Sequence, residues 1–158
     1  MAASHSRILS LVPAAEGEVE HVPALVTAGE YLVKFSHWHT CLLFGKQGKL
    51  AIVFTVCDLG AHFGTRLLRW YNVRLRGKSG HNGKFSTGWG SDLLHEYVRL
   101  VGMTTRCDRI ALTRYSGLLI RAKVETVTTS RTQGKLPDAL HYSVIRKLLS
   151  IEAGKAAA

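Results

Sequence analysis

The chain has 158 residues, of which 46% are apolar and 20% are charged, and this composition is typical of one globular domain. It contains no run of eighteen apolar residues, which excludes a membrane-spanning helix, and its N-terminus lacks the pattern of a secretory signal. Three widely separated cysteines argue against a disulfide framework, so we expect a cytoplasmic protein.

Positive charge is concentrated after the first thirty residues. Residues 1–30 hold one arginine and four glutamates, whereas residues 31–158 hold 20 bases and 7 acids. A field of this size attracts polyanions and makes their binding sensitive to salt. Residues 1–28 mix Ala, Glu, Ser and Pro without a periodic pattern, which predicts a flexible acidic arm.

We expect the folded domain to span residues 29–151, followed by a frayed tail at 152–158. Apolar and polar residues alternate from residue 31 to 44, which is the period of a β-strand, and a glycine-containing turn follows at 45–48. Residues 50–57 form a nearly continuous apolar run rich in β-branched side chains. Such a run predicts a strand that is buried on both faces.

A third strand is predicted at 65–76, and its two faces differ. One face carries Leu67, Arg69 and Tyr71 and is typical of a core, although it includes an arginine. The other face is basic and has Trp70 at its centre, which favours a ligand surface. The glycine-rich residues 77–90 predict a long loop, and loops of this length are often functional.

One helix and two further strands complete the chain. The helix is predicted at 92–101, with Ser91 as its N-cap and Gly102 at its C-terminal end. Alternation predicts a strand at 118–127 and a hairpin loop at 130–137, and the segment 142–149 fits either a strand or a short helix.

The predicted order of three strands, a helix and two strands is that of an OB-fold, a mainly β, five-stranded Greek-key barrel. The chain therefore resembles the OB-fold single-stranded DNA-binding proteins, in particular the small ones of phages and mobile elements. The resemblance covers residues 29–149 and rests on element order and the basic and aromatic pattern. It implies a ligand surface on the third strand and two hairpin loops, a homo-oligomer, and the cytoplasm of a bacterial or phage-infected cell.

The strongest candidate site lies between Asp58 and Asp92, where the sequence has no acid, six bases and five aromatic residues. Single-stranded nucleic acid requires this combination, because cations follow the phosphates and rings stack on unpaired bases. The alternative is that these rings pack in the barrel wall, with solvated arginines around them. The residues that we predict to bind nucleic acid are Trp70, Arg66, Arg74, Arg76, Lys78, Lys84, Phe85, Trp89, Trp38, Lys46, Lys49, Arg121, Lys123, Arg131 and Lys135.

Other kinds of site are poorly supported. His37, His39 and Cys41 share one strand face but lack a fourth metal ligand, so we expect no metal and no cofactor. Gly77-Lys78-Ser79 lacks the earlier glycine of a phosphate-binding loop, and no G-x-S-x-G motif is present. Acids are too scattered to bind catalytic Mg²⁺, and Asp92 and Glu96 fit capping or surface roles on the helix.

We therefore predict a protein that is not an enzyme and that binds single-stranded DNA without sequence specificity, in replication or recombination. Two alternatives remain open at this point. The same barrel could be a protein-interaction or inhibitor module that binds an acidic partner through its basic face, or it could bind RNA. No membrane partner is expected.

Overall fold

The computed structural model describes residues 24–130 and 132–153. The described chain contains eight strands, one α-helix and two short 3-10 helices. In chain order these are β1 (Gly29–Leu43), β2 (Gln47–Val56), β3 (Arg66–Asn72), β4 (Arg74–Leu75), β5 (Gly80–His81), β6 (Phe85–Ser86), α1 (Asp92–Val101), η2 (Leu112–Tyr115), β7 (Leu119–Val127), η3 (Asp138–Leu140) and β8 (Tyr142–Ala153).

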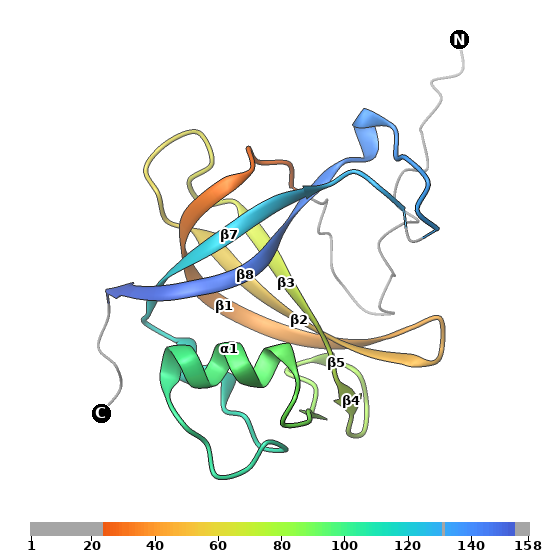
Figure 1. Cartoon of the computed structure of the whole chain (residues 1–158), viewed down its shortest axis with the longest axis vertical. Coiled ribbons are helices and arrows are strands. Elements are labelled where there is room, and N and C mark those ends of the chain that lie inside the picture. The colour runs from red at the N-terminus through yellow and green to blue at the C-terminus, as the bar shows by residue number, and fades with distance from the viewer. Residues whose placement is uncertain (1–23, 131, 154–158) are drawn as a thin grey trace.

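The five long strands form one antiparallel sheet in the order β3-β2-β1-β7-β8, which curls strongly into a half-barrel (Figure 1). Strands β3 and β8, at the two ends of this order, approach each other. Helix α1 lies below the sheet in the view of Figure 1 and packs near β8. The prediction of a mainly β, barrel-like domain with one α-helix is therefore confirmed.

Strand β2 runs through the centre of the fold. All five side chains from Leu50 to Phe54 are fully buried, so both faces of this strand are covered, as the apolar run predicts. Its inner face joins the main core, together with Val33, Leu67 and Ile120. The β-branched and apolar residues of the run suit this position because they pack on both sides of a pleated strand.

Helix α1 has the predicted ends. The Ser91 side chain accepts a hydrogen bond from the Leu94 N–H at 3.2 Å, which satisfies one of the free donors of the first turn. At the other end, Gly102 adopts a φ of 112° and donates its N–H to the carbonyl of Val98. Leu93 and Tyr97 are buried against the sheet. Within the part of the chain that the structure describes, no helix is long and apolar enough to cross a membrane.

The folded body begins earlier than the sequence indicates. Of the predicted arm, residues 1–23 lie outside the described residues, but residues 24–28 are attached to the start of β8. Ser143 hydrogen-bonds to both Ala24 and Val26, and Val26 is only 3% exposed. The segment whose structure was ambiguous, residues 142–149, is a strand and continues to Ala153. Most of the predicted tail, residues 154–158, lies outside the described residues.

The glycine-rich segment 77–90 is attached to the sheet along part of its length. Strand β5 pairs with the second half of β1, and the Asn82 N–H donates to the carbonyl of Trp38 at 3.0 Å. Gly83 lies so close to β1 that an added Cβ would meet the Thr40 hydroxyl at 1.9 Å. The segment is therefore docked on β1 over residues 80–83, whereas the sequence predicts one long loop from residue 77 to 90.

Candidate nucleic-acid interface

Strand β3 presents the two faces that its alternation predicts. Leu67 and Tyr71 are buried in the core, and Arg69 points to the same inner side. Trp70 lies on the opposite face and is partly exposed, and Arg66, at the start of the strand, is exposed. Trp70 is therefore not enclosed in the interior, which agrees with its predicted outward position.

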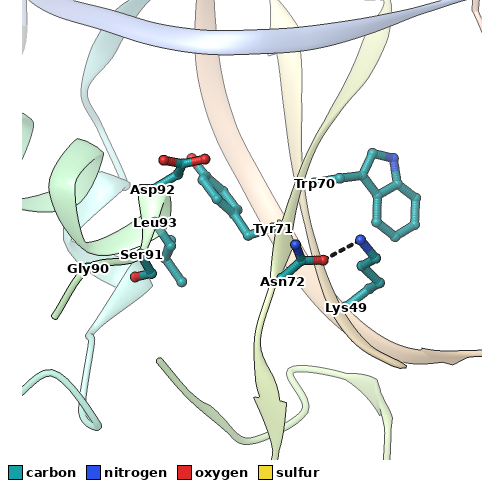
Figure 2. A pocket seen from close by; sticks show the side chains of 8 residues that line it. All are labelled: Lys49, Trp70, Tyr71, Asn72, Gly90, Ser91, Asp92 and Leu93. Carbon is teal, nitrogen blue, oxygen red and sulfur yellow. Dashed lines mark hydrogen bonds between the residues drawn. The ribbon is translucent and has the colours of Figure 1, made fainter. Parts of the chain in front are cut away.

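Trp70 occupies the middle of an outer surface formed by β1, β2 and β3. The strand register places Trp70, Ala51 and His39 in one row across the three strands, and the rings of Trp70 and His39 meet edge to face at 6.0 Å. In the next row, the Lys49 ammonium donates a hydrogen bond to the Asn72 side chain (Figure 2). A ring, an amide and a cation are thus adjacent on this surface, and β2 and β3 contain no acid.

Exposed cations continue from β3 into the following segment. β4 pairs with β6, and the Arg76 N–H donates to the carbonyl of Lys84 at 2.9 Å, which brings these two basic residues together. Within the described residues, none of these cations has a carboxylate within 4 Å, although the charge of Arg76 contributes to lowering the pKa of Asp108, after the larger effect of Arg106. The exposed cations of this region are Arg66, Arg74, Arg76, Lys78 and Lys84.

The basic residues of β7 differ from Arg66 of β3 and Arg74 of β4 because they have acidic partners. Arg121 lies 2.8 Å from Glu152 and 3.9 Å from Glu30, and Lys123 lies 3.2 Å from Glu125. Glu125 is shared, because it also lies 2.9 Å from Arg146. These salt bridges make Arg121 and Lys123 less available to a ligand than the cations without such partners, and their predicted role in nucleic-acid binding stays a prediction.

Two of the predicted stacking residues are partly buried and pack against the core. Trp38 lies with its ring centre 6.3 Å from that of Phe35, and its indole N–H donates to the Gly83 carbonyl at 3.2 Å. Phe85 also packs against the core. These contacts hold both rings in place, whereas Trp89 is 57% exposed just before helix α1.

Within the described residues, the two hairpin loops supply fewer exposed cations than predicted. Lys46 is exposed in the turn between β1 and β2, and Lys135 is exposed between β7 and β8. Both loops turn at the right-hand side of the view in Figure 1. Arg131 lies outside the described residues. Lys49 is partly buried by its contact with Asn72, so Lys46 is the more accessible cation of the first hairpin.

A pocket lies where the end of β3 meets the start of α1, and Figure 2 shows its lining. It has a volume of about 290 Å³. Trp70 and Lys49 lie on one side of β3, and Tyr71 and the first residues of the helix lie on the other. The pocket is lined by Lys49, Trp70, Tyr71, Asn72, Gly90, Ser91, Asp92 and Leu93.

A buried ion pair behind this surface was not predicted. The Arg69 guanidinium lies 2.8 Å from the Glu96 carboxylate, with side chains only 13% and 6% exposed, and the Tyr71 hydroxyl donates to the same carboxylate. Arg69 also stacks over the Tyr71 ring at 4.4 Å. The expected capping or surface role of Glu96 is therefore wrong. Its helical spacing from the buried Leu93 and Leu100 was the signal that places it on the apolar face.

This cluster changes the acid–base properties of its members. Burial disfavours the charge of Arg69, but its hydrogen bond to Glu96 opposes this effect and the pKa of Arg69 is raised. Burial, reinforced by the negative charge of Glu96, raises the pKa of Tyr71 well above its usual value, and the pKa of the neighbouring Tyr115 is raised for the same reasons. Arg69 is therefore a structural cation and is not available to phosphates.

These raised pKa values predict a loss of stability at alkaline pH. Unfolded tyrosines lose their protons above pH about 10, while Tyr71 and Tyr115 stay protonated in the folded state. Their contribution to the free energy of unfolding is complete below pH about 10. Above this pH, each of the two tyrosines lowers the free energy of unfolding by about 1.4 kcal/mol per pH unit. Urea unfolding at pH 8, 10 and 11 measures this slope, and Tyr115→Phe should make it shallower. Equal slopes for the variant and the original protein would contradict the assignment.

A metal centre finds no support in the described part of the chain. His37, His39 and Cys41 share the outer face of β1, but no group of three His, Cys, Asp or Glu side chains there is arranged to bind an ion. Cys41 is only 3% exposed, and burial raises the pKa of its thiol, which disfavours the thiolate that metals bind.

The site thus consists of Trp70 and Asn72 on β3, exposed cations on both sides of them, and the pocket beside α1. Comparisons with protein-family models, with curated proteins and with solved structures found no match to this chain.

Proposed function

We propose that this protein binds single-stranded DNA on the outer surface of β1, β2 and β3, in replication or recombination. The observation that carries the proposal is the separation of charge. Arg66 and the cations of residues 74–84 are exposed and have no carboxylate within 4 Å among the described residues, whereas Arg121 and Lys123 of β7 form salt bridges. Unpaired cations beside an accessible ring suit a polyanion whose bases are free to stack.

The arrangement of strands supports an OB-fold within this proposal. A three-stranded meander is followed by α1 and then by β7 and β8, and β1 lies between β2 and β7 in the sheet. The ends of the strand order, β3 and β8, approach each other as closure of a barrel requires. Oligonucleotides bind OB-folds on the face of the second and third strands, which here correspond to β2 and β3.

Within this surface the residues have distinct roles. Trp70 stacks a base, with Trp89 as a second exposed ring at the start of the helix. The phosphates run along the exposed cations on either side of Trp70. In this proposal those cations are Arg66, Arg74, Arg76, Lys78, Lys84 and Lys46.

Titration with a poly-dT oligonucleotide, followed by tryptophan fluorescence at two salt concentrations, tests the proposal. We expect strong quenching at low salt that weakens at high salt, because cations bound to phosphates release counterions. Duplex DNA should bind more weakly, since its bases cannot stack on Trp70. Equal affinity for duplex and single strands, or no binding, would overturn the proposal. An RNA oligonucleotide of matching sequence and an acidic polypeptide, tested in parallel, address the two alternative partners.

The charge separation predicts which arginines set the salt dependence. Arg74→Ala together with Arg76→Ala should reduce the slope of log K against log salt by about 0.7 for each phosphate that is no longer neutralised. Arg121→Ala should leave the slope unchanged, because Arg121 is paired with Glu152. Affinity for a poly-dT oligonucleotide between low and physiological salt gives both slopes. A larger effect from Arg121→Ala than from the double substitution would contradict the assignment.

A further inference from the structure

The pocket between β3 and α1 is lined by both hydrogen-bonding and aromatic residues. Its volume of about 290 Å³ is at the lower end for small-molecule sites, which suits one planar ring system better than a larger ligand. Trp70, Tyr71 and Leu93 supply apolar surface, and Asn72, Ser91 and Asp92 supply polar groups (Figure 2). Trp70 is one of the lining residues, so the pocket is next to the residue that we propose to stack a base.

Backbone groups of β3 also face the pocket side. The Val73 N–H donates to the Gly48 carbonyl, and the Val56 N–H donates to the Thr65 carbonyl. These two bonds show which residues of β3 direct their backbone groups toward β2. In an antiparallel pair, the residues between these positions direct their N–H and C=O groups away from the partner strand. Trp70 and Asn72 therefore present backbone groups at the free edge of β3. Of these, the Trp70 carbonyl accepts from Arg69 at 3.3 Å.

Asp92 gives the pocket a chemical preference. It is exposed, it lines the pocket, and it has no ion-pair partner among the described residues. Its carboxylate ends a stretch that otherwise contains only basic charges. A carboxylate repels phosphate, and ionised it only accepts hydrogen bonds. Among the groups of a nucleic-acid strand, it therefore attracts hydrogen-bond donors, which lie on the edges of the bases.

Among the four DNA bases, guanine has two adjacent donors, N1–H and the N2 amino group, on the edge that single-stranded recognition reads. Two carboxylate oxygens match this pair of donors. The first turn of α1 adds N–H donors for the guanine O6, because Leu94 bonds to Ser91 while the N–H groups of Asp92 and Leu93 precede any intrahelical acceptor. Thymine places its single N–H between two acceptors and fits a carboxylate less well.

We propose that this pocket binds one guanine base of the bound strand, with Asp92 accepting its N1–H and N2–H donors. The inference rests on the proposed function and adds a base preference to it. Binding along the rest of the surface stays independent of sequence, because the cations contact phosphates only.

The test compares labelled oligo-dT of about 15 nucleotides, a length within the range of one OB-fold site, with the same oligonucleotide carrying one central dG, dA or dC. Fluorescence anisotropy at a fixed salt concentration gives each affinity. We expect the dG oligonucleotide to bind at least about fivefold more tightly than oligo-dT, the lower end for a bidentate base contact. The dA and dC oligonucleotides should stay close to oligo-dT.

Asp92→Asn is the decisive variant, because it keeps the shape of the side chain and removes its charge. We expect it to abolish the preference for dG while leaving affinity for oligo-dT equal or higher, since a repulsive charge is removed. Asp138→Asn, in the exposed η3 segment, is the matched control and should preserve the preference. A partly unfolded variant would weaken all oligonucleotides alike, so the ratio of dG to dT affinity separates recognition from stability.

The outcomes distinguish this inference from the proposed function. Binding of oligo-dT without a dG preference in the original protein would overturn the guanine site and leave the single-stranded DNA proposal standing. A dG preference that persists in Asp92→Asn would also overturn the site. No binding of any oligonucleotide would overturn both proposals.

Discussion

Replacing Glu96 with alanine should lower the free energy of unfolding by about 3–5 kcal/mol. The substitution leaves the Arg69 guanidinium buried without its carboxylate, and it removes the acceptor of the Tyr71 hydroxyl. An unpaired buried charge is strongly unfavourable because it has given up its water without gaining a partner. Urea unfolding, followed by circular dichroism at neutral pH, measures the change.

A double substitution distinguishes the cost of leaving one buried charge unpaired from the net contribution of the ion pair to the free energy of unfolding. Arg69→Met together with Glu96→Leu removes both charges and fills a similar volume, so it should recover the part of the stability that Glu96→Ala loses through the unpaired Arg69, while the Tyr71 hydroxyl still lacks its acceptor. It should also retain affinity for oligo-dT, because Arg69 faces the core and not the outer surface. A double variant as unstable as Glu96→Ala would show that the ion pair itself contributes substantially. Loss of DNA affinity in a folded double variant would place Arg69 in the binding surface.

Trp70→Ala should weaken the binding of oligo-dT by about 1–3 kcal/mol, the usual range for removal of one stacked base. Trp70→Phe should have a smaller effect, because it keeps a ring on the outer face of β3. Neither variant should change the slope of affinity against salt, since no cation is removed. Fluorescence anisotropy with an end-labelled oligonucleotide measures all three proteins without relying on tryptophan emission.

Phe63→Ala provides the control for this experiment. Phe63 is an exposed ring in the loop between β2 and β3, at the end of the sheet opposite the pocket, and the proposal gives it no role in binding. Thermal unfolding of each variant checks the fold, because Trp70 lies beside the buried Ala51 in the sheet. Unchanged affinity in a folded Trp70→Ala protein would remove the stacking role, and an equal effect in Phe63→Ala would show that the change is not specific to Trp70.

Local sequence pattern was sufficient to predict the five long strands and the helix, but not the short strands β4, β5 and β6, and the strand predicted at 65–76 ends at Asn72. The alternation in β1 and β7, the apolar run of β2, and the Ser91 and Gly102 ends of α1 all appear in the structure at or near the expected residues. These features depend on side-chain period and on capping, which are properties of neighbouring residues. The ambiguity at residues 142–149 was resolved by pairing with β7, a contact between segments that sequence pattern does not describe.

The candidate site was only partly predictable, because alternation tells which residues share a face but not what lies opposite that face. Trp38 has the same residue type as Trp70, yet docking of Gly83 on β1 gives its indole N–H an acceptor, and the ring packs against the core. Arg121 has the same charge as Arg74, yet Glu152 of β8 lies beside it.

Periodicity and composition along a continuous piece of chain were enough to define the long strands and the α-helix, the acid-free basic stretch and the outward position of Trp70. Three features emerged with the folded arrangement: which cations remain unpaired, the buried pair of Arg69 and Glu96, and the pocket that Asp92 shares with Trp70. Charge pairing, burial and pocket formation depend on residues from distant parts of the chain, and it is the curl of the sheet that brings those residues together.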